Sequence, residues 1–322
     1  MNYKLKKISS DASFREFYRL KKNNKTSIIV FAKKDKYKNL IVYSVVNNIL
    51  NSNKVNAPRL ISNHYKSNMI EISDLGDKSF YDFIILRKNK LNEYKSLIKL
   101  IIKIQKIKTK KFYKLGKFKI KFSKYTSSYL HKESDLFFDW YLKYSLKKKN
   151  INKIKKLFKT ELNKIYKKLH FKNETFVHRD FHASNIMLRK KKLGVIDSQD
   201  AIIGNPLYDV ASLIDDVRIK LPKDLQSDLF KFYCKNSKHK KEKIEKLKND
   251  FDILSMQRNL KILGIFVRLF KRDNKLNYLK YLPYTWLLVE KRMKNPIFNK
   301  LNILFKKHLP LKKLKKLQKY EN

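Results

Sequence analysis

The segment from His178 to Asn185, which reads HRDFHASN, constrains this chain more than any other stretch. It fits the pattern HRDxxxxN, and Asp197 follows it after two short apolar runs. In phosphoryl transfer, an aspartate at the position of Asp180 takes the proton of the acceptor hydroxyl, and an asparagine and a second aspartate hold Mg²⁺ against the nucleotide phosphates. Mg²⁺ prefers oxygen ligands such as amides and carboxylates. The pattern therefore predicts Asp180 as the catalytic base and Asn185 and Asp197 as the metal ligands.

Short apolar segments on both sides of the motif support this prediction. Residues 176–177 predict a strand that leads into it, and residues 186–196 predict a hairpin that follows it. Such a hairpin returns the chain and brings Asp197 back beside Asn185. The alternative is that Asp180 and Asp197 only terminate strands in turns, which requires the polar residues to converge by chance.

The composition indicates a folded protein without disulfide bonds. Of the 322 residues, 43% are hydrophobic, which is enough for a core despite 33% charged residues. The single cysteine, Cys234, excludes a disulfide framework and any multi-cysteine zinc site. The first ten residues contain lysines but no apolar signal segment, and no apolar run reaches the roughly 18 residues of a membrane span. We therefore expect a cytoplasmic protein with no transmembrane segment.

The formal net charge of +50 suggests a nucleic-acid partner. However, the lysines are spread over the whole chain together with many asparagines and isoleucines, and there are only five glycines. This distribution is typical of a bias toward A- and T-rich codons, and lysines at this density form solvated helix faces. We therefore expect nonspecific polyanion binding at low salt and no specific nucleic-acid partner. The basic segment 306–319 predicts a docked amphipathic helix, with a contact to an anionic membrane or RNA as the alternative.

The hydrophobic periodicity divides the chain into two parts. The first quarter predicts a hairpin, a helix and two further strands, at 14–20 with 26–32, at 37–50, and at 58–61 and 69–72. From residue 79 the pattern is mainly helical, with helices expected at about 79–86, 91–108, 125–147, 151–169, 206–219, 224–236, 241–270 and 278–293. We therefore expect an α+β, bilobal, protein-kinase-like fold. Residues 1–75 are its small β-rich nucleotide-binding lobe, and residues 76–322 are its larger, mainly helical lobe for catalysis and substrate binding.

The nucleotide site has an unusual phosphate loop, because the chain has no GxxxxGK motif and no glycine before Gly76. Small residues let backbone N–H groups approach phosphates. The candidate loop is therefore the serine-rich turn before the hairpin, with the arginine after it: Ser10, Asp11, Ala12, Ser13, Phe14 and Arg15. The adenine of ATP is expected against the hinge between the lobes, at Ile72, Asp74 and Leu75. An ordinary turn without a ligand is the alternative for both segments.

These motifs resemble the aminoglycoside-phosphotransferase/choline-kinase superfamily, and within it the bacterial N-acetylmuramate/N-acetylglucosamine 1-kinases. The superfamily resemblance depends on HxDxxxxN and the metal aspartate. The resemblance to the sugar kinases depends on VIDSQDA at 195–201 and MQRNLKILGIF at 256–266. The matching segments follow the family's order from residue 10 to about 285 and include 10–15, 74–77, 136–141, 177–185, 194–201 and 256–266.

The resemblance implies a monomeric kinase that uses ATP and Mg²⁺. It would phosphorylate the anomeric hydroxyl of N-acetylmuramate, N-acetylglucosamine or both, in peptidoglycan recycling. The resemblance also implies that His178 orients the catalytic loop through backbone hydrogen bonds and that Asp209 braces this loop from a helix start. Two alternatives are another small-molecule kinase, acting on an aminoglycoside, choline or another alcohol, and a basic nucleic-acid-binding pseudokinase. The chain has only 28 acidic residues against 78 basic ones, which disfavours a cationic aminoglycoside as the acceptor. The presence of Asp180, Asn185 and Asp197 disfavours a pseudokinase without activity.

Four further residues are candidates for substrate binding, namely His182, Asp200, Gln257 and Arg258. The last two lie on an otherwise apolar helix, where a buried arginine needs a partner. That partner is either a substrate group, such as the N-acetyl carbonyl or the lactyl carboxylate, or an internal acid such as Asp252. Asp200 lies either beside the metal ligands or in a simple turn. A zinc site between His178 and His182 is not expected, because no cysteine accompanies them.

The chain departs from the family pattern in two places. Family members usually carry an aromatic residue at position 198, whereas this chain has Ser198, so different packing behind the metal aspartate is expected. The phosphate-contacting lysine of most kinases has no clear counterpart. Lys33 and Lys34 follow the second strand of the hairpin, and Arg15 or Arg19 are the other candidates for this role.

Overall fold

The computed structural model describes residues 3–8, 15–23, 25–33, 37–146 and 150–308. By its internal contacts the chain divides into two compact units: unit 1 comprises residues 1–123 and 175–203, and unit 2 comprises residues 124–174 and 204–322. Neither boundary of these units falls between residues 75 and 76, where the boundary of the two lobes is expected. The lobe boundary therefore stays a prediction. An N-terminal antiparallel sheet and a mainly helical C-terminal part confirm the α+β class.

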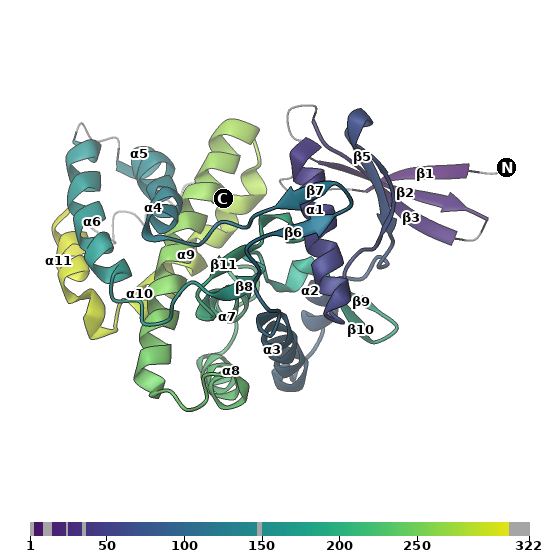
Figure 1. The fold of residues 1–322 in the computed structure, drawn as a ribbon. Coiled ribbons are helices and arrows are strands. Elements are labelled where there is room, and N and C mark those ends of the chain that lie inside the picture. Colours follow the sequence, from purple (N-terminus) through teal and green to yellow (C-terminus); the bar gives the residue numbers. More distant parts are fainter. Residues whose placement is uncertain (1–2, 9–14, 24, 34–36, 147–149, 309–322) are drawn as a thin grey trace. The chain divides into compact units, whose positions relative to one another are not determined.

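Unit 1 contains a five-stranded antiparallel sheet with the order β1-β2-β3-β5-β4 (Figure 1). Its strands are β1 (Tyr3–Ile8), β2 (Glu16–Lys22), β3 (Lys25–Phe31), β4 (Leu60–His64) and β5 (Met69–Ser73). β2 and β3 form the expected hairpin. β5 pairs with both β3 and β4. These two pairings and that of β2 with β3 are antiparallel. The strands expected at 58–61 and 69–72 are therefore confirmed, with β4 beginning two residues later than expected.

Helix α1 (Tyr37–Ser52) packs against this sheet. Its Leu40 and Tyr43 join Ile28 of β3 and Ile70 of β5 in one buried hydrophobic cluster. The apolar residues of α1 recur at helical spacing, which is why the segment forms a helix with a buried face. Each large aliphatic side chain in such a cluster stabilises the fold by roughly 1.5–3 kcal/mol.

The motif segment also lies in unit 1. Strand β8 (Thr175–Val177) leads into it, and the expected hairpin of β9 (Ile186–Arg189) and β10 (Lys192–Val195) follows it. β8 also pairs with β11 (Ile202–Gly204). The remaining regular elements are α2 (Phe80–Ile84), α3 (Leu91–Gln105), β6 (Tyr113–Leu115) and β7 (Phe118–Ile120). The small hairpin of β6 and β7 was not predicted, because each of its strands has only three residues.

Unit 2 is built around the long helix α9. Its helices are α4 (Ser127–Leu136), α5 (Lys143–Leu146), α6 (Ile151–Tyr166), α7 (Leu207–Ile214), α8 (Lys223–Asn236), α9 (Ile244–Asp273), α10 (Leu282–Arg292) and α11 (Asn299–His308). α9 contacts α4, α7 and α10, and every residue from 250 to 264 is buried. A helix that is buried on all sides lies at the centre of its domain. Among the described helices, none combines the length and the apolar character needed to cross a membrane.

The helix expected over 125–147 is divided into three parts. α4 ends at Leu136, residues Phe137–Leu142 form a π-helical segment, and α5 follows. The aromatic side chains of Phe137, Phe138 and Tyr141 in this segment are buried and contact one another. Single π-helical turns inside α-helices are rare and leave the hydrophobic periodicity nearly unchanged, so the pattern of the sequence did not reveal this one.

A very close helix crossing in unit 2 explains the glycine in the middle of α9. A Cβ atom at Gly264 would lie 2.2 Å from the backbone oxygen of Leu136 and 2.7 Å from the backbone nitrogen of Phe137. In an ordinary helix, alanine is more stable than glycine by about 1 kcal/mol. Here the order is reversed, because backbone atoms cannot move away from the added Cβ atom as a flexible side chain can. We expect Gly264→Ala to lower the free energy of unfolding by about 1–3 kcal/mol.

Urea denaturation of the purified variant measures this loss. Ser227→Ala is the matched control, because Ser227 is exposed on α8 and its replacement changes only helix propensity. Gly264→Ala with the stability of the unaltered protein would show that the two helices can separate without cost.

Candidate active site

The catalytic loop begins at the end of β8, where a buried histidine anchors it. His178 is fully buried, and its Nε2 lies 3.1 Å from the backbone oxygen of Ile196. This contact joins the start of the motif to the residue before Asp197. Arg179 has a φ of 80°, a conformation that few non-glycine residues adopt and that is enriched at functional sites. His178 thus makes the kind of backbone contact that its predicted orienting role requires.

Asn185 closes the same loop from its other end. Its side-chain Nδ2 donates to the backbone oxygen of Asp180 at 3.0 Å, and its backbone oxygen accepts from the N–H of Ile196 at 3.0 Å. Because the amide nitrogen is directed at Asp180, the side-chain oxygen is the atom left to hold a metal ion. The hydrogen bond between residues 185 and 196 therefore brings the two predicted metal ligands, Asn185 and Asp197, close to each other.

The side chain of Asp180 is half-buried. Among the residues that the structure describes, its carboxylate takes part in no hydrogen bond or ion pair. A carboxylate without bound donors keeps its lone pairs available to accept a proton. This arrangement suits the predicted general base.

Asp197 is held by two neighbouring side chains of unit 1. Its Oδ1 accepts from Nη2 of Arg15 at 2.5 Å and from Nε2 of Gln199 at 3.2 Å. Gln199 in turn accepts from Nη1 of Arg15 at 2.7 Å, which closes a ring of three hydrogen bonds. Within the described residues, this arrangement leaves Oδ2 of Asp197 to hold a metal ion.

Arg15 is a buried cation in this site. Its side chain is 3% exposed, and its guanidinium group lies 5.5 Å from the ring centre of Phe17 and 5.4 Å from that of Tyr43. Aromatic faces stabilise a cation in such positions. Burial raises the pKa of Tyr43, so this side chain stays neutral beside Arg15.

Arg19, the other candidate arginine, is engaged at the expected hinge. Its Nε lies 2.7 Å from Oδ2 of Asp74, and its Nη1 pairs with Asp77. Oδ1 of Asp74 accepts from the backbone N–H of Gly76 at 2.8 Å, and Gly76 has a φ of 93°, which favours glycine. Burial alone would raise the pKa of Asp74, but the contacts with Arg19 and Gly76 more than offset it, so this pKa is lowered. Stability that depends on Asp74 is therefore present near neutral pH and is lost in acid.

The predicted nucleotide-binding residues are only partly described. Ile72 is buried in the hydrophobic cluster of the sheet, the carboxylate of Asp74 is occupied by Arg19, and Leu75 is half-buried. Residues 10–14 and Lys34 lie outside the described residues. Lys33 is exposed, which leaves Arg15 as the buried basic candidate for the phosphate-contacting role. Nucleotide contacts at these positions stay predictions.

Ser198 makes a specific contact in place of an aromatic side chain. Its Oγ donates to Oδ1 of Asn47 at 2.7 Å, and both side chains are buried. Asn47 belongs to α1, so a hydrogen bond joins this helix to the residue after Asp197. The expectation that packing at position 198 differs from the family pattern is consistent with this contact.

His182 and Asp200 also lie in unit 1. His182 is buried, and its Nε2 is 3.3 Å from Nδ2 of Asn185. Asp200 is exposed, accepts from Nε2 of Gln199 at 3.1 Å and lies 3.7 Å from Nη1 of Arg179. Asp200 therefore contacts the residue that holds Asp197, which favours a place beside the metal ligands over a simple turn.

Gln257 and Asp209 belong to unit 2. Gln257 donates to Oε2 of Glu133 at 3.1 Å, and the ammonium group of Lys261 lies 3.2 Å from Oε1 of the same carboxylate and 3.1 Å from the hydroxyl of Tyr208. Gln257 is thus already hydrogen-bonded within this buried group. Asp209 is buried in the first turn of α7, and its bracing role stays a prediction.

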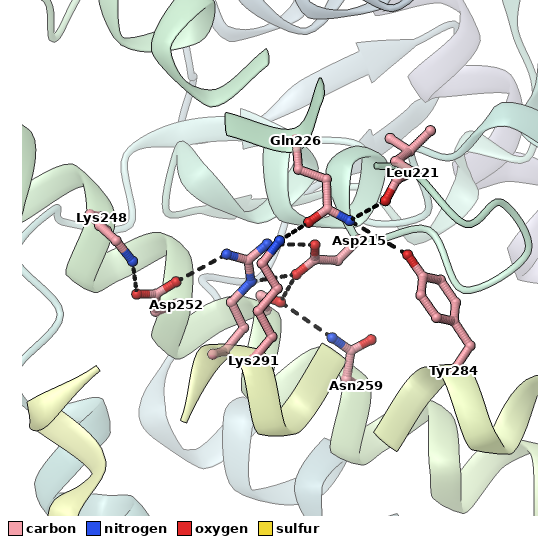
Figure 2. Close-up of polar contacts among 10 residues, drawn as sticks. Asp215, Leu221, Gln226, Lys248, Asp252, Asn259, Tyr284 and Lys291 are labelled. Carbon is pink, nitrogen blue, oxygen red and sulfur yellow. Dashed lines mark hydrogen bonds and ion pairs between the residues drawn. The ribbon is translucent and has the colours of Figure 1, made fainter. Parts of the chain in front are cut away.

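The alternative partner proposed for Arg258, Asp252, is engaged elsewhere. Asp252 accepts from Lys248 at 2.6 Å, as Figure 2 shows, and from Arg292 at 3.4 Å. In the described part of the chain, Arg258 forms no ion pair and no hydrogen bond, and its Nη1 is buried without a partner. The interpretation that Asp252 neutralises Arg258 is therefore wrong.

The donor set of unit 1 fits Mg²⁺ and does not fit zinc. Asn185 and Asp197 offer one amide oxygen and one carboxylate oxygen, and Mg²⁺ binds through few protein oxygens while it retains water and phosphate ligands. The described residues contain no cluster of three or more histidine, cysteine, aspartate or glutamate side chains that could hold a metal ion. His178 and His182 contact backbone and amide groups instead.

Two residues that contact predicted site residues, one in each unit, were not predicted themselves. Gln199 follows Asp197 in the VIDSQDA motif, so its place in the motif was the available signal. Lys261 lies one helical turn beyond the predicted Gln257, in a chain where lysines are too frequent to stand out. The partners of both residues come from distant segments, Arg15 and Glu133 respectively, which the sequence alone does not bring together.

Comparison with known proteins agrees with this geometry. Residues 4–244 match the model of the phosphotransferase enzyme family. The N-acetylmuramate/N-acetylglucosamine kinase of Pseudomonas aeruginosa is 27% identical over 280 residues, which cover 85% of this chain and 79% of that protein. The kinase of the same name from Neisseria meningitidis is 24% identical over 279 residues, covering 85% and 81%.

Solved structures show the same fold. An ethanolamine kinase of Plasmodium vivax superposes with a TM-score of 0.64 at 13% identity, covering 89% of this chain and 82% of that one. The ADP-bound aminoglycoside phosphotransferase APH(2'')-Ib superposes with a TM-score of 0.59 at 14% identity, covering 90% and 94%. These likenesses confirm the kinase-like fold class. Because the family model matches about three quarters of the chain, the chain belongs to the phosphotransferase enzyme family and is an ATP-dependent phosphotransferase.

Proposed function

We propose that this protein is a sugar kinase that transfers the γ-phosphoryl group of ATP to the anomeric hydroxyl of N-acetylmuramate, N-acetylglucosamine or both. The observation that carries the proposal is the similarity, over 85% of the chain, to two kinases named for these sugars. Such an activity would serve the recycling of peptidoglycan. We place it in the cytoplasm, where ATP is available, and we expect a monomer.

In this proposal Asp180 is the general base. Its carboxylate accepts the proton of the anomeric hydroxyl while the sugar oxygen bonds to the γ-phosphorus and the bond from that phosphorus to the bridging oxygen of ADP breaks. A positioned base of this kind contributes roughly 10²–10⁴-fold to the rate. Most of the remaining acceleration comes from alignment and charge stabilisation.

Asn185 and Asp197 would hold Mg²⁺, which neutralises charge on the phosphates when it is bound. Arg15 has the role of a positioning residue. By holding Oδ1 of Asp197 together with Gln199, it fixes the direction of Oδ2. His178 and Asn185 fix the loop on which Asp180 lies. The chain thus orients its base and its metal ligands before any substrate binds.

The proposed function predicts which acceptors the protein uses. In an ATP-turnover assay with Mg²⁺, we expect activity with N-acetylmuramate or N-acetylglucosamine and none with choline or kanamycin. The product should be an acid-labile sugar 1-phosphate, and chelation of Mg²⁺ with EDTA should stop turnover. Activity with choline or kanamycin alone would keep the kinase and reject the sugar, and activity with none of the four would reject the proposed acceptor class.

A further inference from the structure

Asp197, the predicted metal aspartate of unit 1, has a left-handed backbone. Its φ and ψ are 61° and 40°, which is a strained conformation for a residue with a Cβ atom, even though aspartate adopts it more readily than most. Such a conformation persists where the surrounding contacts fix it. The direction of the Cα–Cβ bond changes with the backbone conformation, so the position of the carboxylate depends on how the two neighbouring residues are held.

The catalytic loop fixes the residue before Asp197. The backbone N–H of Ile196 donates to the backbone oxygen of Asn185 at 3.0 Å, and the backbone oxygen of Ile196 lies 3.1 Å from Nε2 of His178. Both partners belong to the same motif segment as Asp180. This side of the left-handed residue is therefore held by structure that is close to it along the chain.

Helix α1 fixes the residue after Asp197. Oγ of Ser198 donates to Oδ1 of Asn47 at 2.7 Å, and these two side chains are 0% and 1% exposed. Ser198 begins a 3₁₀ turn that ends at Asp200 and packs against α1. A hydroxyl has one hydrogen to donate, and this contact uses it. The orientation of Ser198, directly after the metal aspartate, therefore depends on a side chain of α1.

The same face of α1 also contacts the arginine that holds the carboxylate. Tyr43 lies four residues before Asn47, and residues at this spacing share one face of a helix. The guanidinium group of Arg15 is 5.4 Å from the ring centre of Tyr43, and its Nη2 donates to Oδ1 of Asp197. One buried face of α1 thus meets both the partner of the Asp197 side chain and the residue that follows Asp197.

We propose that Asn47 is a positioning residue for the metal site. Through its hydrogen bond with Ser198, it holds Asp197 in the left-handed conformation and so keeps Oδ2 of that carboxylate in the direction that a metal ligand needs. The inference rests on the proposed function, because it takes Asp197 as a ligand of Mg²⁺, but it does not depend on which acceptor is phosphorylated.

Loss of the acceptor oxygen on α1 has a specific physical consequence. In Asn47→Ala the hydroxyl of Ser198 is buried without its acceptor, and an unmade buried hydrogen bond costs free energy. Rotation of the turn toward another acceptor relieves this cost and lets Asp197 leave the left-handed conformation. The affinity for Mg²⁺ then falls, whereas Asp180 lies on a loop whose own contacts the change leaves in place.

Isothermal titration calorimetry of ADP binding at increasing Mg²⁺ concentrations measures the affinity for the metal ion without turnover. We expect Asn47→Ala and Ser198→Ala each to raise the half-saturating Mg²⁺ concentration about 3- to 10-fold, which corresponds to the loss of one buried hydrogen bond. ADP binding without Mg²⁺ should stay unchanged, and so should kcat at saturating Mg²⁺. Asn48→Ala is the matched control, because Asn48 is the next residue of α1 and is exposed.

The double variant tests whether Asn47 acts through Ser198. Because both single changes break the same contact, Asn47→Ala combined with Ser198→Ala should raise the half-saturating Mg²⁺ concentration by the same factor as either change alone. An increase equal to the product of the two single factors would show that the residues act independently, and it would overturn the proposal.

A role in stability alone would lower the melting temperature of these variants and leave their Mg²⁺ dependence equal to that of the unaltered protein, which would reject the inference. ADP binding that does not respond to Mg²⁺ in the unaltered protein would reject Asp197 as a metal ligand, and the inference with it. Failure of the proposed function is distinct, because neither sugar would be turned over while the Mg²⁺ titration still decides the role of Asn47. Ser198→Ala breaks the same hydrogen bond and gives the answer if Asn47→Ala does not fold.

Discussion

Replacing Asp180 with asparagine is expected to lower kcat by about 10²–10⁴-fold, because the amide cannot accept the proton of the acceptor hydroxyl. The change is nearly isosteric. In the described structure the carboxylate of Asp180 has no hydrogen bond to lose, so the free energy of unfolding should stay within about 0.5 kcal/mol of the original value. The expected signature is thus a large loss of activity in a protein of unchanged stability.

Steady-state kinetics with the best acceptor, together with urea denaturation, measure both quantities. Asp228→Asn is the matched control, since Asp228 is exposed on α8 and the substitution removes one carboxylate there. A value of kcat above a tenth of the original in Asp180→Asn would assign the proton transfer to another group. A loss of activity accompanied by unfolding would point to a structural role for Asp180 instead.

The sequence predicted those parts of the site in which the functional residues are close to one another along the chain, so that local structure determines their relative positions. Residues Asp180 and Asn185 lie on one loop, and a hairpin with a turn of two residues between β9 and β10 brings the chain back to Asp197. Two short apolar runs separated by a tight turn have few other solutions than a hairpin. The catalytic loop and its hairpin could therefore be read before any tertiary contact was known.

The contacts that hold these residues could not be predicted in the same way. Arg15 and Asp197 are separated by 182 positions, and the chain offers dozens of other basic residues as partners. Only the tertiary structure decides that Arg15 reaches Asp197 while Arg19 pairs with Asp74. The partner of Arg258 could not be predicted for the same reason. Whether Asp252 or a ligand neutralises it depends on the other residues that contact Asp252, which are Lys248 and Arg292.

A second large effect is expected in unit 2, where Arg292 lies between two buried aspartates. Asp215 and Asp252 are both about 1% exposed, and Arg292 forms ion pairs with each. Figure 2 shows the network around them, in which Lys248 also binds Asp252 and Lys291 binds Gln226. Burial alone would lower the pKa of Arg292, but Asp215 and Asp252 more than offset it, so this pKa is raised and the group stays charged.

We expect Arg292→Met to lower the free energy of unfolding by about 3–5 kcal/mol at neutral pH, because methionine fills a similar volume and leaves buried carboxylates without their cation. Stability is the quantity to measure, because each of the two carboxylates is about 1% exposed and water cannot solvate them in place of the lost cation.

Urea denaturation at pH 7 measures this loss. Arg272→Met is the control, since Arg272 and Asp273 form an exposed pair on α9, and exposed pairs contribute at most about 1 kcal/mol. If Arg292→Met cost as little as the control, the carboxylates of Asp215 and Asp252 would have to be satisfied by Ser255, Lys248 and Asn295 alone. The double variant Arg292→Met with Asp215→Asn distinguishes these cases, because removing the charge of Asp215 should restore part of the lost stability only if that charge was left without its cation.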